Sequence, residues 1–248
     1  MEQNSCKFLI ISRNRSDIIT SHKLFPFAQI LVPESEKSDY EHLSNDIETV
    51  PDSIIGLGQL RNWILDTYKE EIVIMLDDDI TSCRCISRES YYKVQNPDDV
   101  KTILLNAANC AKDLGTSVFG FDQNADVRKY KASSPFNFCA WVGGVIGVIG
   151  RKYRFLADHK FKVDIDFCLN VLMKERIIFK DNRFSFLQNR NFMKGGNSSF
   201  RRQADVDQEV YRLKNKWGSH YQFKKTKTGE DTKIRVQRRN PLMLLKHF

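Results

Sequence analysis

The chain has 248 residues, of which 41% are hydrophobic and 28% charged, and this composition excludes an intrinsically disordered protein. Its length suits one large domain or two small ones and is sufficient to bury a hydrophobic core. The formal net charge of +8 is unevenly distributed, because residues 190–248 carry 15 Lys/Arg against 5 Asp/Glu and residues 1–189 carry 24 against 26. A basic C-terminal quarter indicates either a polyanionic partner or a solvated tail.

Targeting and redox features indicate a cytoplasmic protein. No apolar stretch reaches the roughly 18 residues that a membrane-spanning helix needs. The apolar run near the N-terminus is too short for a signal peptide, and no small-residue cleavage site follows it. The cysteines show neither a disulfide framework nor zinc-ligand spacing. We therefore expect reduced thiols at all six positions, which are Cys6, Cys83, Cys85, Cys110, Cys139 and Cys168.

The first half of the chain alternates predicted strands and helices. Short continuous apolar runs predict buried strands at residues 7–12, 28–32, 72–76 and 118–121. Helices are predicted at 60–68 and 98–114 from their apolar periodicity, with a short helix capped by Ser16 or Asp17 and a weak one at 40–43. The alternation predicts an α/β fold with a mostly parallel central sheet flanked by helices.

The second half is less regular. Residues 138–149 contain Gly143, Gly144 and Gly147 and predict a strand, a tight turn and a second strand. Further elements are predicted as helices at 164–174 and 205–217 and as short strands at 177–179 and 184–187. The strongly basic stretch 224–239 follows the last helix.

Two polar clusters directly follow predicted strands, at residues 12–15 and at Asp77–Asp79. Carboxyl ends of parallel strands share one edge of a sheet, where ligands bind in such folds. Three adjacent carboxylates repel one another unless a cation neutralises them, and a hard divalent ion such as Mg²⁺ or Mn²⁺ is the usual partner. Such an ion would bring a nucleotide diphosphate, whereas the structural alternative is a polar loop with a helix-capping aspartate.

Two further sets of polar residues lie at predicted helix starts. Arg61 follows the glycines of GLGQLRNW and is suited to a phosphate. Asp164 and Asp166 offer either a general base or helix caps. The GLG segment lacks the rest of a dinucleotide-binding fingerprint, and the sequence contains no P-loop, GxSxG or HExxH motif.

Read in order, KFLIISRNR, GLGQLRNWILD, IVIMLDDDI and VDIDFCLNVLMKERIIFKDN resemble the motifs of GT-A fold glycosyltransferases over about residues 5–225. The acidic motif at the head of the second-half helix has Val163 where that fold often has an acid. Within the fold, the RNW helix shortly before DDDI and the KGGN loop look most like the TET-associated glycosyltransferases, a bacteriophage family implicated in glycosylating hydroxymethylated pyrimidines in DNA.

The resemblance implies one GT-A-like domain at residues 1–225, with a nucleotide-sugar half (1–115) and an acceptor half (116–225), and a basic segment at 226–248. It implies a UDP-sugar donor, a Mn²⁺ or Mg²⁺ cofactor, modified duplex DNA as acceptor, and a monomeric protein in the cytoplasm of the host cell. The sugar remains open between glucose and arabinose. Retention and inversion at the anomeric carbon are both open as well. The expected base is hydroxymethylcytosine, with hydroxymethyluracil as the alternative.

Site residues follow from the same resemblance. The family pattern implies a general base or acceptor-orienting role for Asp166 or Asp164. Donor contacts are implied for Ser12, Arg13, Arg15, Arg61, Asp77, Asp78 and Lys194, the last in a glycine-containing loop that closes over the donor. Metal ligands are implied at Asp79, Asp77 and His220. DNA phosphate contacts are expected at Lys224, Lys225, Lys227, Arg238 and Arg239.

Other functions share parts of this pattern. A glycosyltransferase acting on a glycan or a protein would need the same donor site. A nucleotidyltransferase could share the first half of the chain, with its alternating strands and helices, and the metal-binding aspartates. A module that binds DNA without catalysis would keep the fold and the basic segment.

Overall fold

The computed structural model describes residues 6–87, 89–124, 126–158, 161–189, 203–226 and 229–237. Four residues to which the sequence assigns roles lie outside these ranges: Lys194, Lys227, Arg238 and Arg239.

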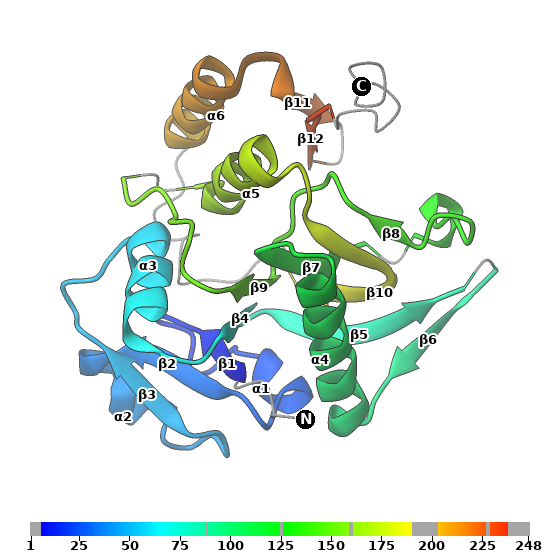
Figure 1. The fold of residues 1–248 in the computed structure, drawn as a ribbon. Helices are drawn as coiled ribbons and strands as arrows, with labels where there is room; N and C mark the ends of the chain where they lie inside the picture. The colour runs from blue at the N-terminus through cyan, green and yellow to red at the C-terminus, as the bar shows by residue number, and fades with distance from the viewer. Residues whose placement is uncertain are drawn as a thin grey trace.

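A mixed ten-stranded sheet forms the centre of the molecule (Figure 1). Its strands are β1 (Cys6–Ile11), β2 (Gln29–Pro33), β3 (Ile47–Val50), β4 (Ile72–Asp77), β5 (Ile80–Ile86), β6 (Tyr91–Val94), β7 (Val118–Asp122), β8 (Phe136–Asn137), β9 (Val145–Ile149) and β10 (Phe179–Gln188). They follow the order β3-β2-β1-β4-β9-β7-β10-β5-β6, and β8 pairs with β10. Strands β3, β2, β1 and β4 are parallel, and β9 runs antiparallel between β4 and β7. Because β10 is parallel to β7, the carboxyl ends of β1, β4, β7 and β10 meet at one edge.

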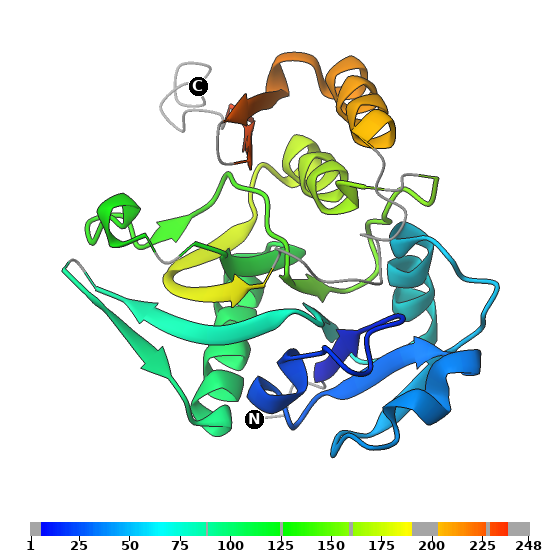
Figure 2. The same cartoon turned by 180° about the vertical axis from the view of Figure 1, so that it is seen from behind.

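Helices cover both faces of the sheet (Figures 1 and 2). They are α1 (Ser21–Leu24), α2 (Lys37–Tyr40), α3 (Leu57–Thr67), α4 (Pro97–Asp113), α5 (Val163–Glu175) and α6 (Gln203–Trp217), with 3₁₀ turns η1 (Glu34–Glu36), η2 (Val127–Lys129) and η4 (Gly218–His220). One hydrophobic core joins the sheet to α3, α5 and α6, and the other joins it to α1, α2 and α4.

Successive side chains of the central strands point to opposite faces of the sheet and pack into different hydrophobic cores. In β1, Leu9 packs into the core with α3 and α5, whereas Phe8 and Ile10 pack into the core with α4. Strand β4 divides in the same way, with Met75 on one face and Leu76 on the other. Burial on both faces explains why these strands are continuous apolar runs.

The α/β architecture expected from the sequence is confirmed, and several details differ. Strands β3, β5 and β6 were not predicted, because they lie toward the sheet edges and lack continuous apolar runs. Residues 138–149 contain one strand rather than two, and the two short strands predicted at 177–187 form the single strand β10. The first helix begins at Ser21 after Thr20, so the predicted cap at Ser16 or Asp17 is wrong.

The C-terminal elements pack against the same core. Strands β11 (Tyr221–Thr226) and β12 (Gly229–Ile234) form an antiparallel hairpin, and Ile234 is buried with residues of α5. The indole Nε1 of Trp141 donates to the carbonyl of Thr232 at 3.2 Å. The division expected after residue 225 therefore falls inside a packed hairpin.

The described residues contain no helix long and apolar enough to cross a membrane. All six cysteines are described and are free thiols. Burial raises the pKa of Cys83 and Cys168 to about 12, so neither is a ready nucleophile.

Gly147 provides a test of how β9 fits between its neighbours. A Cβ at this position would lie 2.1 Å from Cζ of Phe119, which is fully buried on β7. We predict that Gly147→Ala lowers the free energy of unfolding by about 1–3 kcal/mol, measured by urea denaturation. In the Phe119→Leu background the same change should cost much less, because the ring is gone. Equal costs in both backgrounds would contradict the packing explanation.

Candidate functional site

Asp78 joins the turn after β1 to the turn after β4. Arg15 Nη1 lies 2.6 Å from Asp78 Oδ1, and Ser12 Oγ donates to Asp78 Oδ2 at 2.8 Å. The Tyr40 hydroxyl is hydrogen-bonded to Ser12 Oγ at 2.8 Å and accepts from the Arg15 amide at 3.0 Å. Burial raises the pKa of Asp78, while Arg15 and Ser12 oppose that shift. Asp78 is thus committed to joining the two turns.

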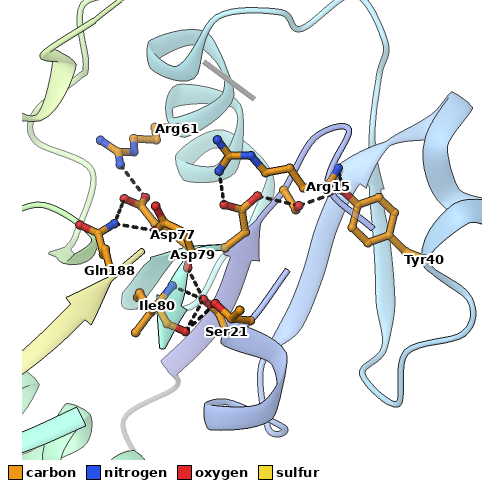
Figure 3. A network of polar contacts seen from close by, with 11 residues as sticks. Arg15, Ser21, Tyr40, Arg61, Asp77, Asp79, Ile80 and Gln188 are labelled. Carbon is orange, nitrogen blue, oxygen red and sulfur yellow. Dashed lines mark hydrogen bonds and ion pairs between the residues drawn. The ribbon is translucent and has the colours of Figure 1, made fainter. Parts of the chain in front are cut away.

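The aspartate turn is also fixed by α1. Ser21 Oγ donates to the carbonyl of Asp77 at 2.6 Å and accepts from the amide of Ile80 at 2.8 Å. The amides of Thr20 and Ser21 donate to the Asp78 carbonyl. These contacts hold the backbone of the turn, while the side chains of Asp77 and Asp79 point toward Gln188 (Figure 3).

Asp77 and Asp79 converge on one amide nitrogen. Gln188 Nε2 lies 2.7 Å from Asp77 Oδ2 and 2.9 Å from Asp79 Oδ1. Burial, together with the charges of Asp77 and Asp78, raises the pKa of Asp79 to about 6. An arrangement that disfavours ionisation in this way is stabilised by positive charge between the carboxylates.

Arg61 supplies positive charge from α3. Its side chain is 3% exposed and places Nη2 3.6 Å from Asp77 Oδ1. Its Nε and Nη1 are buried and have no hydrogen-bond partner among the described residues. Unpaired buried guanidinium nitrogens are costly. These two nitrogens make this edge a suitable place for an anionic ligand that accepts hydrogen bonds, once a cation neutralises the neighbouring aspartates.

Asn62, the neighbour of Arg61, has a structural role. It accepts from the Phe155 amide at 2.9 Å and donates to the Phe155 carbonyl at 2.8 Å. The Phe155 ring stacks on Phe167 of α5 with centroids 3.8 Å apart, and the Arg61 guanidinium lies 5.2 Å from the Phe155 ring centroid. Asn62 thereby fixes one wall around Arg61.

Asp166 is buried beneath α6. Lys216 Nζ lies 2.8 Å and 3.0 Å from its two oxygens, and Trp217 Nε1 donates to Oδ1 at 2.8 Å. The residue is 3% exposed. These contacts attach α6 to α5 and leave little access for an acceptor.

Asp164, two residues before Asp166, lies beside the aspartate edge. A Cβ on Gly143 would lie 2.6 Å from Asp164 Oδ2 and 2.8 Å from Gln123 Nε2. The next residue, Gly144, has φ +72° and packs in the same way against the Gln188 amide. Two consecutive glycines therefore separate Asp164 from the amide that contacts Asp77 and Asp79.

The structure does not bring His220 to the aspartates. Its Nδ1 lies 2.7 Å from the carbonyl of Arg235, where η4 meets the end of β12. Across the described ranges, no three His, Cys, Asp or Glu side chains form a group that could hold a metal. Of the implied metal set, the structure therefore brings together Asp77 and Asp79, whereas the packing of the hairpin holds His220 at the Arg235 carbonyl.

The other predicted site residues that the structure describes are Arg13, Lys224 and Lys225. Arg13 donates to the carbonyls of Ile54 and Ile55, which precede α3. Lys224 and Lys225 are exposed on β11, and Lys225 pairs with Asp207 at 3.0 Å. Such a surface ion pair contributes little to stability.

A cavity of about 630 Å³ opens at the end of β7, beside Asp122. Its lining includes the rings of Tyr130, Phe136 and Phe138. Polar residues of the lining include Asn124, Asn137, Asn182, Asp122, Lys129 and Lys131. Rings and amides in one cavity suit a flat, hydrogen-bonding ligand.

Sequence reasoning missed Gln188, Tyr40 and Ser21. Gln188 could have been found by the rule that identified Ser12 and Asp77, because it directly follows the predicted strand 184–187. Tyr40 and Ser21 act through single hydroxyls on very short helices, and no sequence pattern marks them.

Comparison with known proteins gives a family and a fold. The family model described as TET-Associated Glycosyltransferase matches residues 5–198. Among proteins with curated functions, none matches the sequence. The structure is similar to glucosyl-3-phosphoglycerate synthase from Mycobacterium tuberculosis, with TM-score 0.55 and 12% identity over 98% of this chain and 92% of that one.

A second structure of that synthase, in complex with Mn²⁺, UDP-glucose and phosphoglyceric acid, has TM-score 0.53 and 12% identity over 98% of this chain and 91% of that one. Staphylococcus aureus TarS 1–349 has TM-score 0.44 and 14% identity over 73% of this chain, and the match spans 60% of the TarS chain. The resemblance to GT-A glycosyltransferases inferred from the sequence is confirmed.

Proposed function

This chain belongs to the TET-associated glycosyltransferase family, and on that premise we propose that it transfers a sugar from a UDP-sugar to a hydroxymethylated pyrimidine in duplex DNA. Hydroxymethylcytosine is the expected base. Glucose and arabinose are the candidate sugars.

Arg61 is the observation that carries the donor assignment. It is 3% exposed, and two of its nitrogens lack hydrogen-bond partners among the described residues. A diphosphate would satisfy them, and its negative charge would offset the cost of burying the guanidinium. The carboxyl ends of β1 and β4 also meet here, at the edge where open α/β sheets bind nucleotides. The UDP-glucose complex of the mycobacterial synthase supports UDP as the nucleotide.

The donor set of Asp77 and Asp79 fits a divalent cation. Both side chains are carboxylates aimed at one point, which hard ions such as Mn²⁺ and Mg²⁺ prefer. When bound, such an ion supplies positive charge to the departing diphosphate. Arg61 contributes in the same direction as negative charge develops on the leaving group.

Asp164 is the proposed general base. Its carboxylate lies next to Gly143, close to the aspartate edge, where it would accept the proton of the attacking hydroxymethyl group. Asp166, with Lys216 and Trp217 on its oxygens, is the proposed positioning residue that fixes the first turn of α5. This assignment chooses between the two aspartates that the sequence left open.

The acceptor assignment is supported by the cavity at the end of β7. Its aromatic rings would stack on a base displaced from the duplex, and its asparagine amides would contact the base edge. Exposed Lys224 and Lys225 would contact phosphates. Seven of the fifteen Lys/Arg in the C-terminal quarter lie in described residues, and the proposed contacts of Lys227, Arg238 and Arg239 lie outside them.

The donor assignment predicts opposite effects of Arg61→Met on binding and stability. UDP affinity, measured by calorimetry with Mn²⁺ present, should fall about 10- to 100-fold because charge-assisted hydrogen bonds are removed. The melting temperature without ligand should stay about the same or rise, because removing two buried nitrogens that lack hydrogen-bond partners offsets the loss of the 3.6 Å ion pair with Asp77. Lys112→Ala, which removes an exposed charge on α4, is the control. A lower melting temperature with unchanged UDP affinity would contradict the assignment.

Substitutions of Asp164 and of Asp166 should have different effects on the rate of transfer and on stability. We predict that Asp164→Asn lowers kcat for transfer by about 10²- to 10⁴-fold without lowering the melting temperature, because the general base is removed. Asp166→Asn should lower the melting temperature and weaken transfer only to the extent that less of the protein is folded. The reverse pattern would make Asp166 the base.

The salt dependence of DNA binding tests whether lysines of the β11–β12 hairpin contact DNA phosphates. Replacing Lys224 and Lys225 by alanine should weaken duplex DNA binding, and the slope of log affinity against log salt should become shallower by about 0.9 for each phosphate that the lysines no longer neutralise. Lys93→Ala with Lys112→Ala removes the same charge from other exposed positions. If both double variants bind equally well with the same slope, β11 does not contact DNA.

A further inference from the structure

Gln188 brings a neutral side chain into an acidic site. It is the last residue of β10, and its Nε2 lies between Asp77 Oδ2 at 2.7 Å and Asp79 Oδ1 at 2.9 Å (Figure 3). Both protons of an amide NH₂ group are directed to carboxylates in this arrangement. A single positively polarised group thus bridges the two aspartates.

Two backbone features place the amide there. The pairing of β10 with β5 shifts register between Leu187 and Gln188, and such irregularities redirect side chains at strand ends. Gly144 lies directly against the amide, since a Cβ on it would be 2.9 Å from Gln188 Cδ. Its φ of +72° favours glycine as well. The local backbone is therefore shaped to bring this side chain to the aspartates.

The amide nitrogen contacts the two carboxylate oxygens that a shared cation would bind. Nitrogen of an amide cannot coordinate a metal, whereas the carbonyl oxygen of the same group is a common ligand of hard divalent ions. A half-turn of the amide exchanges the two atoms, and a small withdrawal of the side chain would then leave room for the cation with Oε1 facing it. Arg61, buried beside Asp77 with two nitrogens that lack hydrogen-bond partners among the described residues, is an independent sign that this edge is completed by a ligand.

We propose that Gln188 is a ligand of the divalent cation through Oε1, and that its Nε2 bridges Asp77 and Asp79 when no cation is bound. The proposal rests on the proposed function only in requiring a divalent cation at this edge. It gives Gln188 the place that the sequence assigned to His220, which the structure holds at the Arg235 carbonyl.

The opposite role would be competition, in which the amide only blocks the cation. The two roles predict opposite signs. Removing a ligand weakens cation binding and admits a water molecule to the ion, whereas removing a competitor strengthens binding and leaves the hydration of the ion unchanged.

The test is Mn²⁺ binding to the full chain, measured by electron paramagnetic resonance and by water-proton relaxation, with UDP alone added and no DNA. Gln188→Met keeps the side-chain length beside Gly144 and removes both the oxygen and the N–H groups. Gln222→Ala, an exposed position on β11, is the control. A melting curve without Mn²⁺ establishes that each variant is folded, and Gln188→Ala replaces the methionine variant if that one unfolds.

We expect Gln188→Met to weaken Mn²⁺ binding about tenfold or more and to increase the number of water molecules on the bound ion. Unchanged or tighter binding, or unchanged hydration, would overturn the proposal, as would a wild-type protein that binds no Mn²⁺. Because neither sugar nor DNA enters the measurement, a failure of the proposed acceptor would leave this result intact.

Discussion

The mutual repulsion of three adjacent carboxylates is the constraint on which this site depends. Each aspartate at the end of β4 has its own compensating partner: Arg15 and Ser12 for Asp78, Arg61 for Asp77, and Gln188 for Asp77 and Asp79 together. The sheet topology brings these partners from distant parts of the chain to one edge. Asp78 is satisfied within the protein, whereas the pair Asp77 and Asp79 is suited to a cation.

The same edge joins the two halves of the chain. Gly143 and Gly144 lie between Asp164 and the Gln188 amide, so the proposed base is close to the proposed cation site. Helix α6 reaches this region through Lys216 and Trp217 on Asp166. The C-terminal hairpin packs through Ile234 and the Trp141–Thr232 contact. The basic quarter is therefore partly built into the fold rather than appended to it.

Short-range sequence patterns predicted the centre of the fold. Continuous apolar runs predicted the buried strands β1, β2, β4 and β7, and their carboxyl ends predicted that Ser12 and the aspartates would share an edge. Strand β6 was missed because it is an exposed edge strand, and β5 was missed because polar residues interrupt its apolar ones. Gln188 directly follows a predicted strand and could have been marked by the same rule, but its contact with both aspartates depends on the register shift in β10. The position of His220 at the Arg235 carbonyl depends on the docking of the hairpin, a long-range effect that no local sequence pattern shows.

The central proposal is that this edge directs sugar transfer to DNA. Its most direct test is mass spectrometry of a duplex containing hydroxymethylcytosine after incubation with the protein, Mn²⁺ and either UDP-glucose or UDP-arabinose. We predict that the modified base gains the mass of one hexose or one pentose, and that Asp79→Ala abolishes the gain. An unchanged base with both donors, or an undiminished gain with Asp79→Ala, would contradict the proposal.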